Sequence, residues 1–578
     1  MMKRWGLLGL LALAACGGDD GGDTRSQALL CPGVVAGAVP GEDSSEARLT
    51  HSSALVDGRQ RFLIRYRDAE GVSASHVSGL GDKVLRVFQR VPAVVARLTP
   101  EEREALATDP SVEFIEPDAP RSSLGLSAPV SARVAQQTVR QGSAGEYTPG
   151  LHMVEAPWVW DKEQDGILDL GAPTGEGIKV CVIDSGIDPE HPELKGTLLG
   201  GKDFVDDDDT PWDGDAKGWG EGHGTHVAGI IAAQLGSGSA NVSPDMSANG
   251  VVGVAPGARL LIARVLNKEG VAWASDIIAG LEWCQQQGAH VASLSLGGGG
   301  ESRMEFEAFK SAAAHGMLVI AAAGNTGGPL DYPAAYSSVL AVGAVDQSMR
   351  RAPFSAHGGN LSLMAPGVSV LSTIIREQGT ISQVEVGDIP YSSRPLYLAP
   401  AGRTTGRLVD CGDGASPGSC REATCDGFVA YVDRSDRVPA HVQLTYVMKQ
   451  GARAVIFGDV AREGDQGVLS IGRRGSWVPG ALVSHDMGVS MRRMAGFPAH
   501  VKLHKSDYAF SSGTSMAAPH VTGVAALVWS ARPSLTAAQV RKLLESTAKD
   551  LGAPGKDWDN GYGLVQSSAA LEALESLP

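Results

Sequence analysis

Short apolar segments alternate with helical stretches between residues 178 and 345, and this alternation limits the chain to few folds. The segments are Ile178–Ile183, Leu260–Val265, Val291–Leu296, Leu318–Ala323 and Val339–Val345. Each segment is apolar along most of its length, as in strands that are buried on both faces. Ile277–Trp283 has the pattern of a helix that crosses between such strands. We therefore predict an α/β fold in which helices cover both faces of a mostly parallel sheet.

Size and charge narrow the class of protein. A chain of 578 residues exceeds what one hydrophobic core supports, so we expect several domains. An apolar content of 43% with 20% charged residues is ordinary for a globular protein. The net charge of -16 argues against nucleic acid as a partner, because phosphates repel an acidic surface.

The amino terminus has the pattern of an export signal. A basic pair precedes the apolar run Trp5–Leu13, which is too short to span a membrane. The residues that follow resemble a bacterial lipobox, which predicts a signal peptide over residues 1–15 and a lipid on Cys16. Ordinary cleavage after Ala14 is the alternative. Residues 16–57 are expected to form a flexible tether.

A compact unit is expected between residues 58 and 118. Its predicted strands are Arg61–Tyr66, Val94–Leu98 and Val112–Asp118. A helix is predicted to begin near Thr99, because a proline and two acids follow that residue. Residues 119–149 lack helical or strand periodicity and are rich in Ser, Ala, Gln and Gly, which predicts a cleavable linker.

Three segments far apart in the chain carry an acid, an imidazole and a hydroxyl in the order Asp, His, Ser. They are Val182–Gly186, Gly222–Gly229 and Ser512–Pro519. This order is that of the subtilisin triad and differs from the order in chymotrypsin and the α/β-hydrolases. A fourth segment, Ala321–Asn325, supplies a side-chain amide. The match extends well beyond three letters, and the chain resembles the subtilases, serine endopeptidases of the subtilisin and proteinase K superfamily.

The resemblance assigns a role to each of these side chains. Ser515 would attack the peptide carbonyl, with His223 as general base and then general acid. Asp184 would hold His223 in the correct tautomer, and Asn325 would donate its amide to the oxyanion. His226 is expected to be a packed helix residue instead. Taken alone, Asn325 is also compatible with a structural turn.

The same resemblance predicts how the chain is divided. Residues 58–118 resemble the propeptide of subtilases, a small ferredoxin-like α/β unit that assists folding and acts as an intramolecular inhibitor. An ordinary amino-terminal domain is the alternative. A catalytic domain with the subtilisin-like three-layer fold would cover residues 150–375 and 508–578. Residues 376–507 would be a β-rich protease-associated insert, since subtilisin-type enzymes normally need few residues there.

Substrate recognition is expected to use two backbone edges between which an extended peptide adds itself as a strand. The residues concerned are Gly270, Val271, Ala272, Ser295, Leu296 and Gly297 on the edges, with Ala322, Ala323 and Gly324 on the wall of the primary pocket. Asp331 aligns with the floor of that pocket, where a carboxylate would favour Lys or Arg before the scissile bond. A surface loop carboxylate is the alternative.

An acidic loop precedes the histidine segment. Its crowded carboxylates repel one another, and a cation that takes several oxygen ligands would relieve the repulsion. The loop resembles a structural calcium site of thermitase-like subtilases, with Asp203, Asp206, Asp208 and the Thr210 carbonyl as ligands. The next ligand position holds a tryptophan without a side-chain oxygen, and Asp213 would have to substitute. A solvated acidic loop is the alternative.

Seven cysteines in an exported chain predict disulfides. One local bridge is expected within the cluster of Cys411, Cys420 and Cys425. Cys181 and Cys284 are expected in a strand and a helix, where a buried free thiol and a bridge are both open.

Together these features predict an exported serine endopeptidase that acts on protein or peptide substrates. It would be made as a zymogen and cut by itself within residues 119–149. A lipid on Cys16 would then anchor the propeptide, so that maturation releases the catalytic part from the membrane to the extracellular space. Two alternatives stay open: a non-catalytic protein on the same fold, and a different acyl transfer by the same triad, such as peptide ligation or ester hydrolysis.

Overall fold

The structure, a computed structural model, describes residues 31, 37–38, 58–68, 72, 79–88, 90–124, 146–213, 222–236, 250–435, 437–459, 469, 471 and 475–575. The predicted signal peptide, Cys16, most of the predicted tether and residues 125–145 lie outside the described residues. Within the described part of the chain, no helix has the length and apolar character that a membrane span requires.

A seven-stranded parallel sheet forms the centre of the molecule, in the order β15-β14-β13-β11-β7-β9-β8. Its strands are β7 (Lys179–Asp184), β8 (Leu198–Asp203), β9 (Arg259–Arg264), β11 (Val291–Leu294), β13 (Leu318–Ala322), β14 (Leu340–Val345) and β15 (Leu361–Pro366). Every apolar segment that the sequence analysis singled out overlaps one of these strands. The predicted parallel sheet is therefore confirmed.

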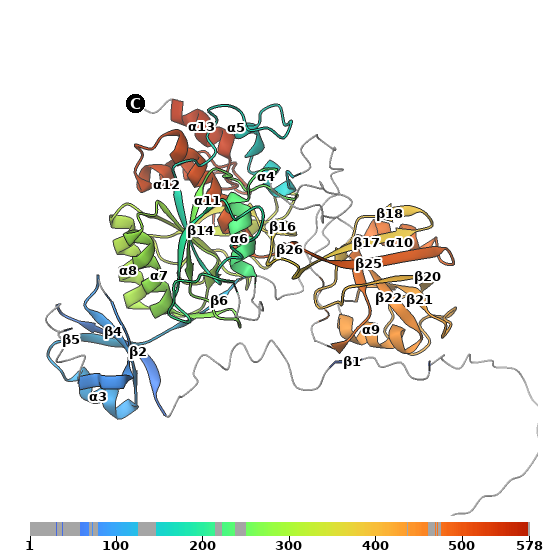
Figure 1. Ribbon diagram of the computed structural model, residues 1–578, viewed down its shortest axis with the longest axis horizontal. Helices are drawn as coiled ribbons and strands as arrows, with labels where there is room; N and C mark the ends of the chain where they lie inside the picture. Colours follow the sequence, from blue (N-terminus) through green and yellow to red (C-terminus); the bar gives the residue numbers. More distant parts are fainter. Residues whose placement is uncertain are drawn as a thin grey trace, which may run out of the picture.

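Helices cover both faces of this sheet (Figure 1). On one face lie α6 (His223–Ala232) and α11 (Thr514–Ala531), and on the other lie α7 (Ala274–Gln286) and α8 (Arg303–Ala314). This arrangement confirms a three-layer fold. We call it the central unit, residues 146–375 and 508–575.

Successive side chains of β7 point to opposite faces of the sheet, and both faces are buried. The strand is therefore apolar along most of its length and does not alternate between apolar and polar residues. Val180 and Val182 belong to the core under α6 and α11, whereas Cys181 and Ile183 belong to the core under α7 and α8. Cys181 forms a disulfide with Cys284 of α7, which decides between the bridge and the free thiols.

Smaller elements complete the central unit. They are α4 (Pro149–Met153), α5 (Pro157–Trp160), α12 (Ala537–Ser546), α13 (Ser567–Glu575) and the antiparallel pair β16 (Val370–Thr373) and β26 (Tyr508–Ser511). β16 is the last strand before the insert and β26 the first strand after it. Their pairing therefore joins the two parts of the central unit that the insert separates in the sequence.

The N-terminal unit, residues 58–118, is a four-stranded antiparallel sheet with the order β3-β4-β2-β5. Its elements are β2 (Gln60–Tyr66), a 3-10 turn (Gly81–Lys83), β3 (Val84–Val87), β4 (Ala93–Leu98), α3 (Pro100–Ala107) and β5 (Val112–Pro117). Thr99 begins α3 with a capping box, because its side chain and that of Glu102 each accept the other's backbone N–H. The sheet and α3 form the small α/β unit that was predicted, and its identity as a ferredoxin-like propeptide stays a prediction.

The strand β6 (Pro120–Ser123) leaves this unit and pairs with the central unit. It lies antiparallel between β10 (Val271–Trp273) and β12 (Leu296–Gly297). The expectation of a linker that begins at residue 119 is therefore wrong for these residues. Their sequence has no strand pattern, since β6 forms only by adding itself between two edges from elsewhere in the chain.

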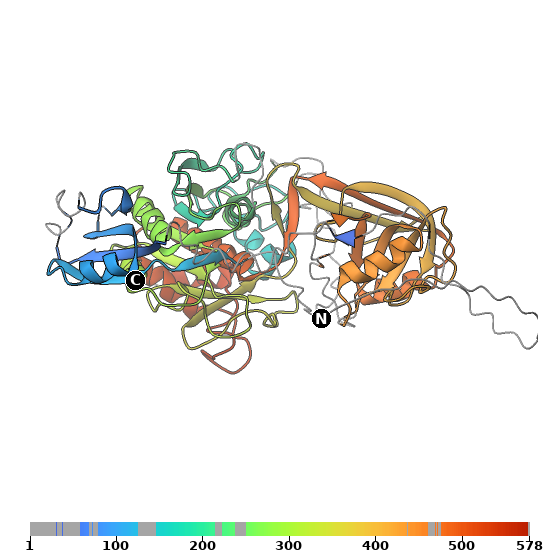
Figure 2. The same cartoon turned by 90° about the horizontal axis from the view of Figure 1, so that it is seen from below.

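The insert, residues 376–507, contains an eight-stranded mixed sheet with the order β18-β17-β25-β20-β21-β22-β24-β19. Its elements are β17 (Gly379–Val386), β18 (Ile389–Tyr391), β19 (Arg394–Pro395), β20 (Gly402–Asp410), β21 (Phe428–Asp433), α9 (Ala440–Lys449), β22 (Ala452–Gly458), β24 (Gly480–Val483), α10 (His485–Arg492) and β25 (Pro498–Ser506). The insert and the N-terminal unit lie at opposite ends of the central unit (Figures 1 and 2).

Two disulfides belong to the insert. Cys411 pairs with Cys420, which confirms the predicted local bridge. Cys425 pairs with Cys31, and β1 (Gly37–Ala38) pairs with β23 (Gly475–Ser476). The tether expected over residues 16–57 is therefore fixed to the insert at these points. The spacing of the cysteines could not indicate a bridge between residues 394 positions apart.

Candidate active site

Asp184 and His223 meet where the carboxyl end of β7 faces the amino end of α6. His223 Nδ1 lies 2.7 Å from Asp184 Oδ1, and both side chains are fully buried. The same carboxylate oxygen accepts a 2.8 Å hydrogen bond from the Ser185 N–H, which helps to fix its direction. The start of α6 can approach the end of β7 this closely because residue 224 is a glycine. A Cβ at that position would collide with the Gly186 carbonyl oxygen. The structure thus brings the predicted acid and imidazole together.

A second buried carboxylate, Asp213, holds the start of α6 in place. Its Oδ2 accepts hydrogen bonds from the N–H and the hydroxyl of Thr225, at 3.0 and 2.6 Å. Its Oδ1 accepts bonds from the Ser185 hydroxyl at 2.9 Å and from the Gly222 N–H at 3.1 Å. Burial raises the pKa of Asp213, and the bonds from Thr225 oppose the rise. Asp213 is therefore a positioning residue for His223, a role that no sequence motif indicated.

Ser515 lies in the first turn of α11 and is bonded to the edge of the neighbouring strand. Its hydroxyl donates to the Ser295 carbonyl at 2.8 Å, and the Ser295 hydroxyl donates to the Ser515 carbonyl at 2.8 Å. The second bond has a cause inside the helix. Pro519, four residues along α11, has no N–H to offer the Ser515 carbonyl. The reciprocal bonds fix the position of Ser515.

Asn325 follows β13 and directs its amide at a carbonyl of the amino-terminal segment. Its Oδ1 accepts hydrogen bonds from the N–H and the hydroxyl of Thr514, both at 2.9 Å. Because these donors identify the oxygen, the NH₂ group faces the other way, where it donates to the Leu124 carbonyl oxygen. A Cβ on Gly513 would collide with that same oxygen. The Leu124 carbonyl therefore lies between the Asn325 amide and the turn that leads into α11.

The segment that ends at Leu124 fills the groove between β10 and β12. The Ser123 N–H donates to the Gly270 carbonyl at 2.9 Å, and the Leu124 N–H donates to the Ser295 carbonyl at 3.2 Å. The predicted edge residues thus form the two sides of one groove, and the strand in it belongs to the chain itself.

Asp331 lies beside the side chain of Leu124. A Cβ built on Gly297 would lie 3.0 Å from Leu124 Cδ1 and 3.1 Å from Asp331 Cβ, and one on Gly324 would lie 2.5 Å from Asp331 Oδ2. Burial raises the pKa of Asp331, and the charge of Arg121 opposes the rise. The Leu124 side chain thus lies near Asp331, and both the place of Asp331 at the floor of the pocket and the preference for Lys or Arg stay predictions.

Two carboxylates of the segment before β6 bind the amino ends of α7 and α8. Asp118 accepts hydrogen bonds from the Ser275 N–H at 3.0 Å and from its hydroxyl at 2.7 Å. Glu116 accepts two bonds of 2.9 Å from backbone N–H groups at the start of α8, and one of 2.7 Å from the Ser302 hydroxyl. Negative charge is favoured at a helix amino end, so these contacts stabilise the docking of the N-terminal unit.

His226 has the structural role that the sequence analysis expected. It is buried on α6, and its Nε2 lies 3.0 Å from the Ala509 carbonyl oxygen. Burial lowers the pKa of His226 to about 3, so its ring is neutral at physiological pH.

The acidic loop is neutralised by an arginine. Arg264 Nη1 contacts Asp203 Oδ2 and lies 2.7 Å from Asp206 Oδ2. Asp208 instead accepts a 2.7 Å hydrogen bond from the Thr210 N–H. Among the described residues, these three carboxylates do not form a group that could share an ion. The loop therefore does not fit the predicted calcium site, because a guanidinium takes the place of the cation between Asp203 and Asp206.

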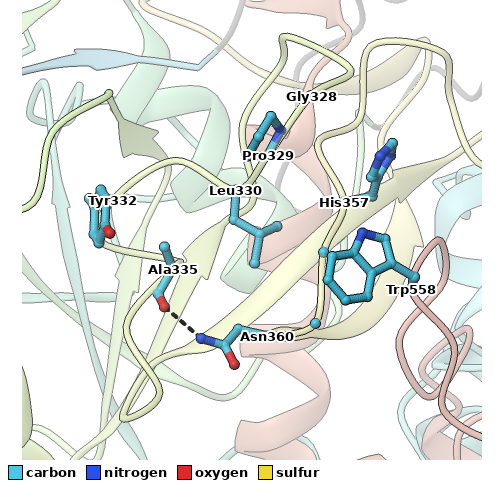
Figure 3. A pocket seen from close by; sticks show the side chains of 10 residues that line it. Gly328, Pro329, Leu330, Tyr332, Ala335, His357, Asn360 and Trp558 are labelled. Atoms are coloured by element: carbon cyan, nitrogen blue, oxygen red, sulfur yellow. Dashed lines mark hydrogen bonds between the residues drawn. The ribbon is translucent and has the colours of Figure 1, made fainter.

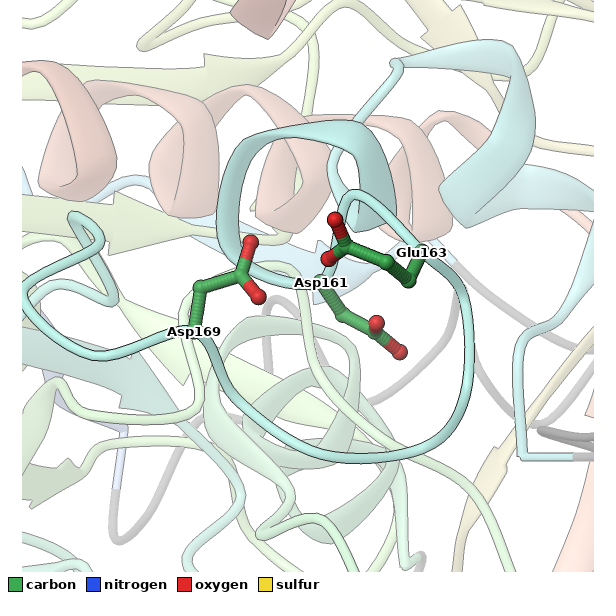
Figure 4. A group of neighbouring side chains, drawn as sticks. All are labelled: Asp161, Glu163 and Asp169. Carbon is green, nitrogen blue, oxygen red and sulfur yellow. The ribbon is translucent and has the colours of Figure 1, made fainter.

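A different group of carboxylates could hold a metal ion. Asp161, Glu163 and Asp169 offer oxygens within 4.8 Å of one another (Figure 4). Asp161 is buried, and it accepts hydrogen bonds from the Tyr147 hydroxyl and from two backbone N–H groups, at 3.1 and 2.9 Å. The sequence gives no signal for this group, because its members fit no ligand spacing.

An open pocket of about 510 Å³ is lined by two loops and Trp558 (Figure 3). The loops contain residues 328–335 and 357–360, and Asn360 closes one side by donating to the Ala335 carbonyl at 2.8 Å. Asp184, His223 and Ser515 do not line this pocket. The groove beside Ser515 is instead filled by β6 and Leu124.

Known proteins resemble this chain over half of its length or more. A model of the Subtilase family matches residues 175–389 and 487–564. The alkaline protease of Alkalihalobacillus alcalophilus is 36% identical over 337 residues, which are 56% of this chain and 76% of that one. Subtilisin E of Bacillus subtilis (strain 168) is 36% identical over 303 residues, which are 52% of this chain and 68% of that one.

Solved structures give the same result. The crystal structure of the psychrophilic subtilisin-like protease Apa1 from Pseudoalteromonas sp. AS-11 aligns with a TM-score of 0.58 at 30% identity. The alignment covers 74% of this chain and 98% of that chain.

Proposed function

Because the chain belongs to the subtilase family and is a serine endopeptidase, we propose that Asp184, His223, Ser515 and Asn325 are its catalytic residues. One observation carries the proposal. The Leu124 carbonyl, at the end of a strand paired like a bound peptide, accepts the Asn325 amide beside the start of α11. The amino end of a helix favours the negative charge that develops on such an oxygen.

The proposed reaction is acyl transfer from a peptide to Ser515 and then to water. The Ser515 hydroxyl turns from the Ser295 carbonyl to the substrate carbonyl carbon, and its proton passes to His223 Nε2. Asp184, bonded to Nδ1, stabilises the imidazolium, while Asn325 stabilises the oxyanion. His223 then returns the proton to the leaving nitrogen and the peptide bond breaks. Water, activated by His223, hydrolyses the ester and regenerates Ser515, leaving a carboxylate and an amine as products.

We propose that the first substrate is the chain itself and that the bond cut is Leu124–Gly125. A carbonyl that already accepts the oxyanion donor belongs to the bond that Ser515 would attack, and the carbonyl in question is that of Leu124. The prediction of a cut within residues 119–149 thereby narrows to one bond. Residues 58–124 would then be the propeptide.

The same contacts explain why the propeptide would inhibit the enzyme after the cut. β6 keeps its pairing with β10 and β12, and Asp118 and Glu116 keep their bonds to α7 and α8. A substrate that needs the same groove must displace all of them. Inhibition would end only when the N-terminal unit dissociates or is degraded.

The proposal is tested with a peptide that reproduces residues 119–128 and carries a fluorophore and a quencher. The processed protein, once its N-terminal fragment has been removed under reducing conditions, is expected to hydrolyse it at the bond between Leu and Gly, and Ser515→Ala is expected to leave it intact. Hydrolysis at the same rate by both proteins would refute the proposal, because a contaminating protease would then be the cause.

The disulfide between Cys31 and Cys425 changes what maturation releases. A cut after Leu124 separates Cys31 from Cys425 along the chain, but the disulfide still joins the two fragments. The hypothesis that maturation frees the catalytic part from the segment with Cys16 therefore conflicts with the structure. If Cys16 is lipidated, the lipid would hold the processed enzyme at the membrane.

We expect the processed protein to run as one species on a non-reducing gel and as two chains on a reducing gel. Cys31→Ser is expected to give two chains without a reductant, because it removes the bridge and leaves the cut. If the wild-type protein loses its amino-terminal fragment without any reductant, the disulfide between Cys31 and Cys425 does not join the two fragments and this prediction is wrong.

Three finer predictions remain proposals. The insert has the β-rich composition expected of a protease-associated domain, and we propose that it is one. Export and lipidation rest on residues 1–16, which lie outside the described residues. Structural calcium is common in subtilases, but we propose none at residues 203–210, where Arg264 already neutralises the carboxylates.

A further inference from the structure

We propose that this enzyme selects substrates with arginine as the fourth residue before the scissile bond, and that Glu305 binds that arginine. The inference deepens the proposed function and rests on the assignment of Leu124 as the residue at the scissile carbonyl. β6 runs through Ser123 directly into Leu124, so Arg121 is the fourth residue before the bond.

Arg121 and Glu305 form a pair that is closed to solvent. Both side chains have an exposed fraction of 0%. Arg121 Nη2 donates to Glu305 Oε2 at 2.6 Å, and Arg121 Nε donates to Glu305 Oε1 at 3.3 Å. The guanidinium therefore binds the carboxylate with two parallel bonds, the geometry that makes arginine specific. Arg121 Nη2 also donates to the Gly300 carbonyl at 3.0 Å.

Residues of the central unit also contact Glu305. Glu305 lies in the first turn of α8, where its N–H donates to the Ser302 hydroxyl at 3.1 Å. The Tyr336 hydroxyl lies 3.0 Å from Glu305 Oε2. The Tyr336 hydroxyl therefore binds the same carboxylate as Arg121 and comes from the central unit. We call Glu305, Ser302, Tyr336 and the Gly300 carbonyl the arginine pocket.

The charge of the pocket needs a matching charge. Burial raises the pKa of Glu305, and Arg121 is the main group that opposes the rise. A peptide without a cation at this position would bury the carboxylate unpaired, which is strongly unfavourable. Lysine would supply the charge but not the planar fork of donors, so it should bind less well than arginine. Sites with buried polar groups reject ligands that leave those groups unpaired.

The structure therefore favours a basic side chain at the arginine pocket and not beside Asp331. The resemblance predicts this preference at Asp331, which lies near Leu124, the residue at the proposed scissile carbonyl. Arg121 of β6 lies three residues before Leu124. Its side chain is fully buried and binds Glu305. The rival explanation is that the pair docks the propeptide and plays no part with other substrates.

The test uses processed Cys31→Ser protein that has been separated from its N-terminal fragment, together with separate peptides, so that docking of the propeptide has no role. The parent peptide reproduces residues 119–128, and its arginine is replaced by lysine or by leucine. We expect kcat/KM for the leucine peptide to be at least about 100-fold lower than for the parent, with the lysine peptide between them.

Variants of the pocket make the test specific. Glu305→Leu is expected to reverse the order of the arginine and leucine peptides, whereas Glu307→Gln, a change at a partly exposed acid on the same helix, should preserve the wild-type order. If Glu305→Leu blocks self-processing, the double variant Arg121→Leu with Glu305→Leu restores a matched pair and should be processed.

The outcomes separate the two proposals. Equal cleavage of all three peptides by the wild type would overturn the arginine pocket and leave the proposed function standing. Cleavage of none of them, by a protein that has lost its propeptide, would overturn the proposed function itself. An unchanged preference in Glu305→Leu would show that another residue binds the arginine.

Discussion

Alanine at His223 is expected to slow self-cleavage by roughly 10⁶-fold, the magnitude known for loss of this base in subtilisin. Its Nδ1 is bonded to Asp184, so this ring can take the Ser515 proton while a carboxylate stabilises the resulting charge. Asp184→Asn keeps the ring but favours the wrong tautomer, and should slow the reaction by roughly 10⁴-fold. The measurement is the rate at which freshly folded precursor is cut after Leu124, followed by mass spectrometry.

An exposed histidine provides the control for this change. His315 lies just beyond α8, away from the groove, and His315→Gln should be processed at the wild-type rate. Thermal melting curves of the variants establish that each has folded. Processing of His223→Ala within tenfold of the wild-type rate would contradict the assigned role.

Alanine at Asn325 should lower kcat by roughly 10²- to 10³-fold, as loss of the equivalent donor does in a subtilisin. The amide donates to the carbonyl where the oxyanion forms, and that bond gains strength only as the charge develops. KM should therefore change little. Asn325→Asp should be slower still, because a carboxylate would repel the oxyanion.

The separation of kcat from KM distinguishes this role from a structural one. Asn325 also accepts two bonds from Thr514, so its loss could displace the turn before Ser515. A displaced turn would disturb substrate binding and raise KM. Asn360→Ala, which removes an exposed asparagine at the open pocket, is the matched control. A higher KM with unchanged kcat in Asn325→Ala would assign the residue to the turn alone.

Five of the seven strands of the central sheet could be predicted because they carry their own signal, whereas β8 and β15 were not predicted. For example, β7 has apolar side chains on both faces, as Val180, Cys181, Val182 and Ile183 show. This pattern can be seen in the sequence without knowing which strands lie beside it. Asp184, His223, Ser515 and Asn325 could be predicted as site residues because each lies at or near the end of a strand or the start of a helix, within a long motif. Local sequence was therefore sufficient for these parts.

The rest depends on partners that are distant in the chain. Pro120–Ser123 has no strand pattern and becomes β6 only between two edges contributed by residues 271–273 and 296–297. Arg264 neutralises an acidic loop that, taken alone, suits calcium. Glu305 gains its partner 184 positions away, and Cys425 gains its partner at Cys31. Patterns within a short stretch of sequence cannot indicate contacts between residues this far apart in the chain.

The most direct measurement of the whole account is the intact mass of the purified full-length protein beside that of Ser515→Ala, both reduced before analysis. We predict that the wild type gives two fragments that meet between Leu124 and Gly125 and that the variant stays whole. This result would establish the nucleophile, the position of the oxyanion site and the zymogen together. A wild-type chain that stays whole under folding conditions, or a variant cut at the same bond, would contradict the account.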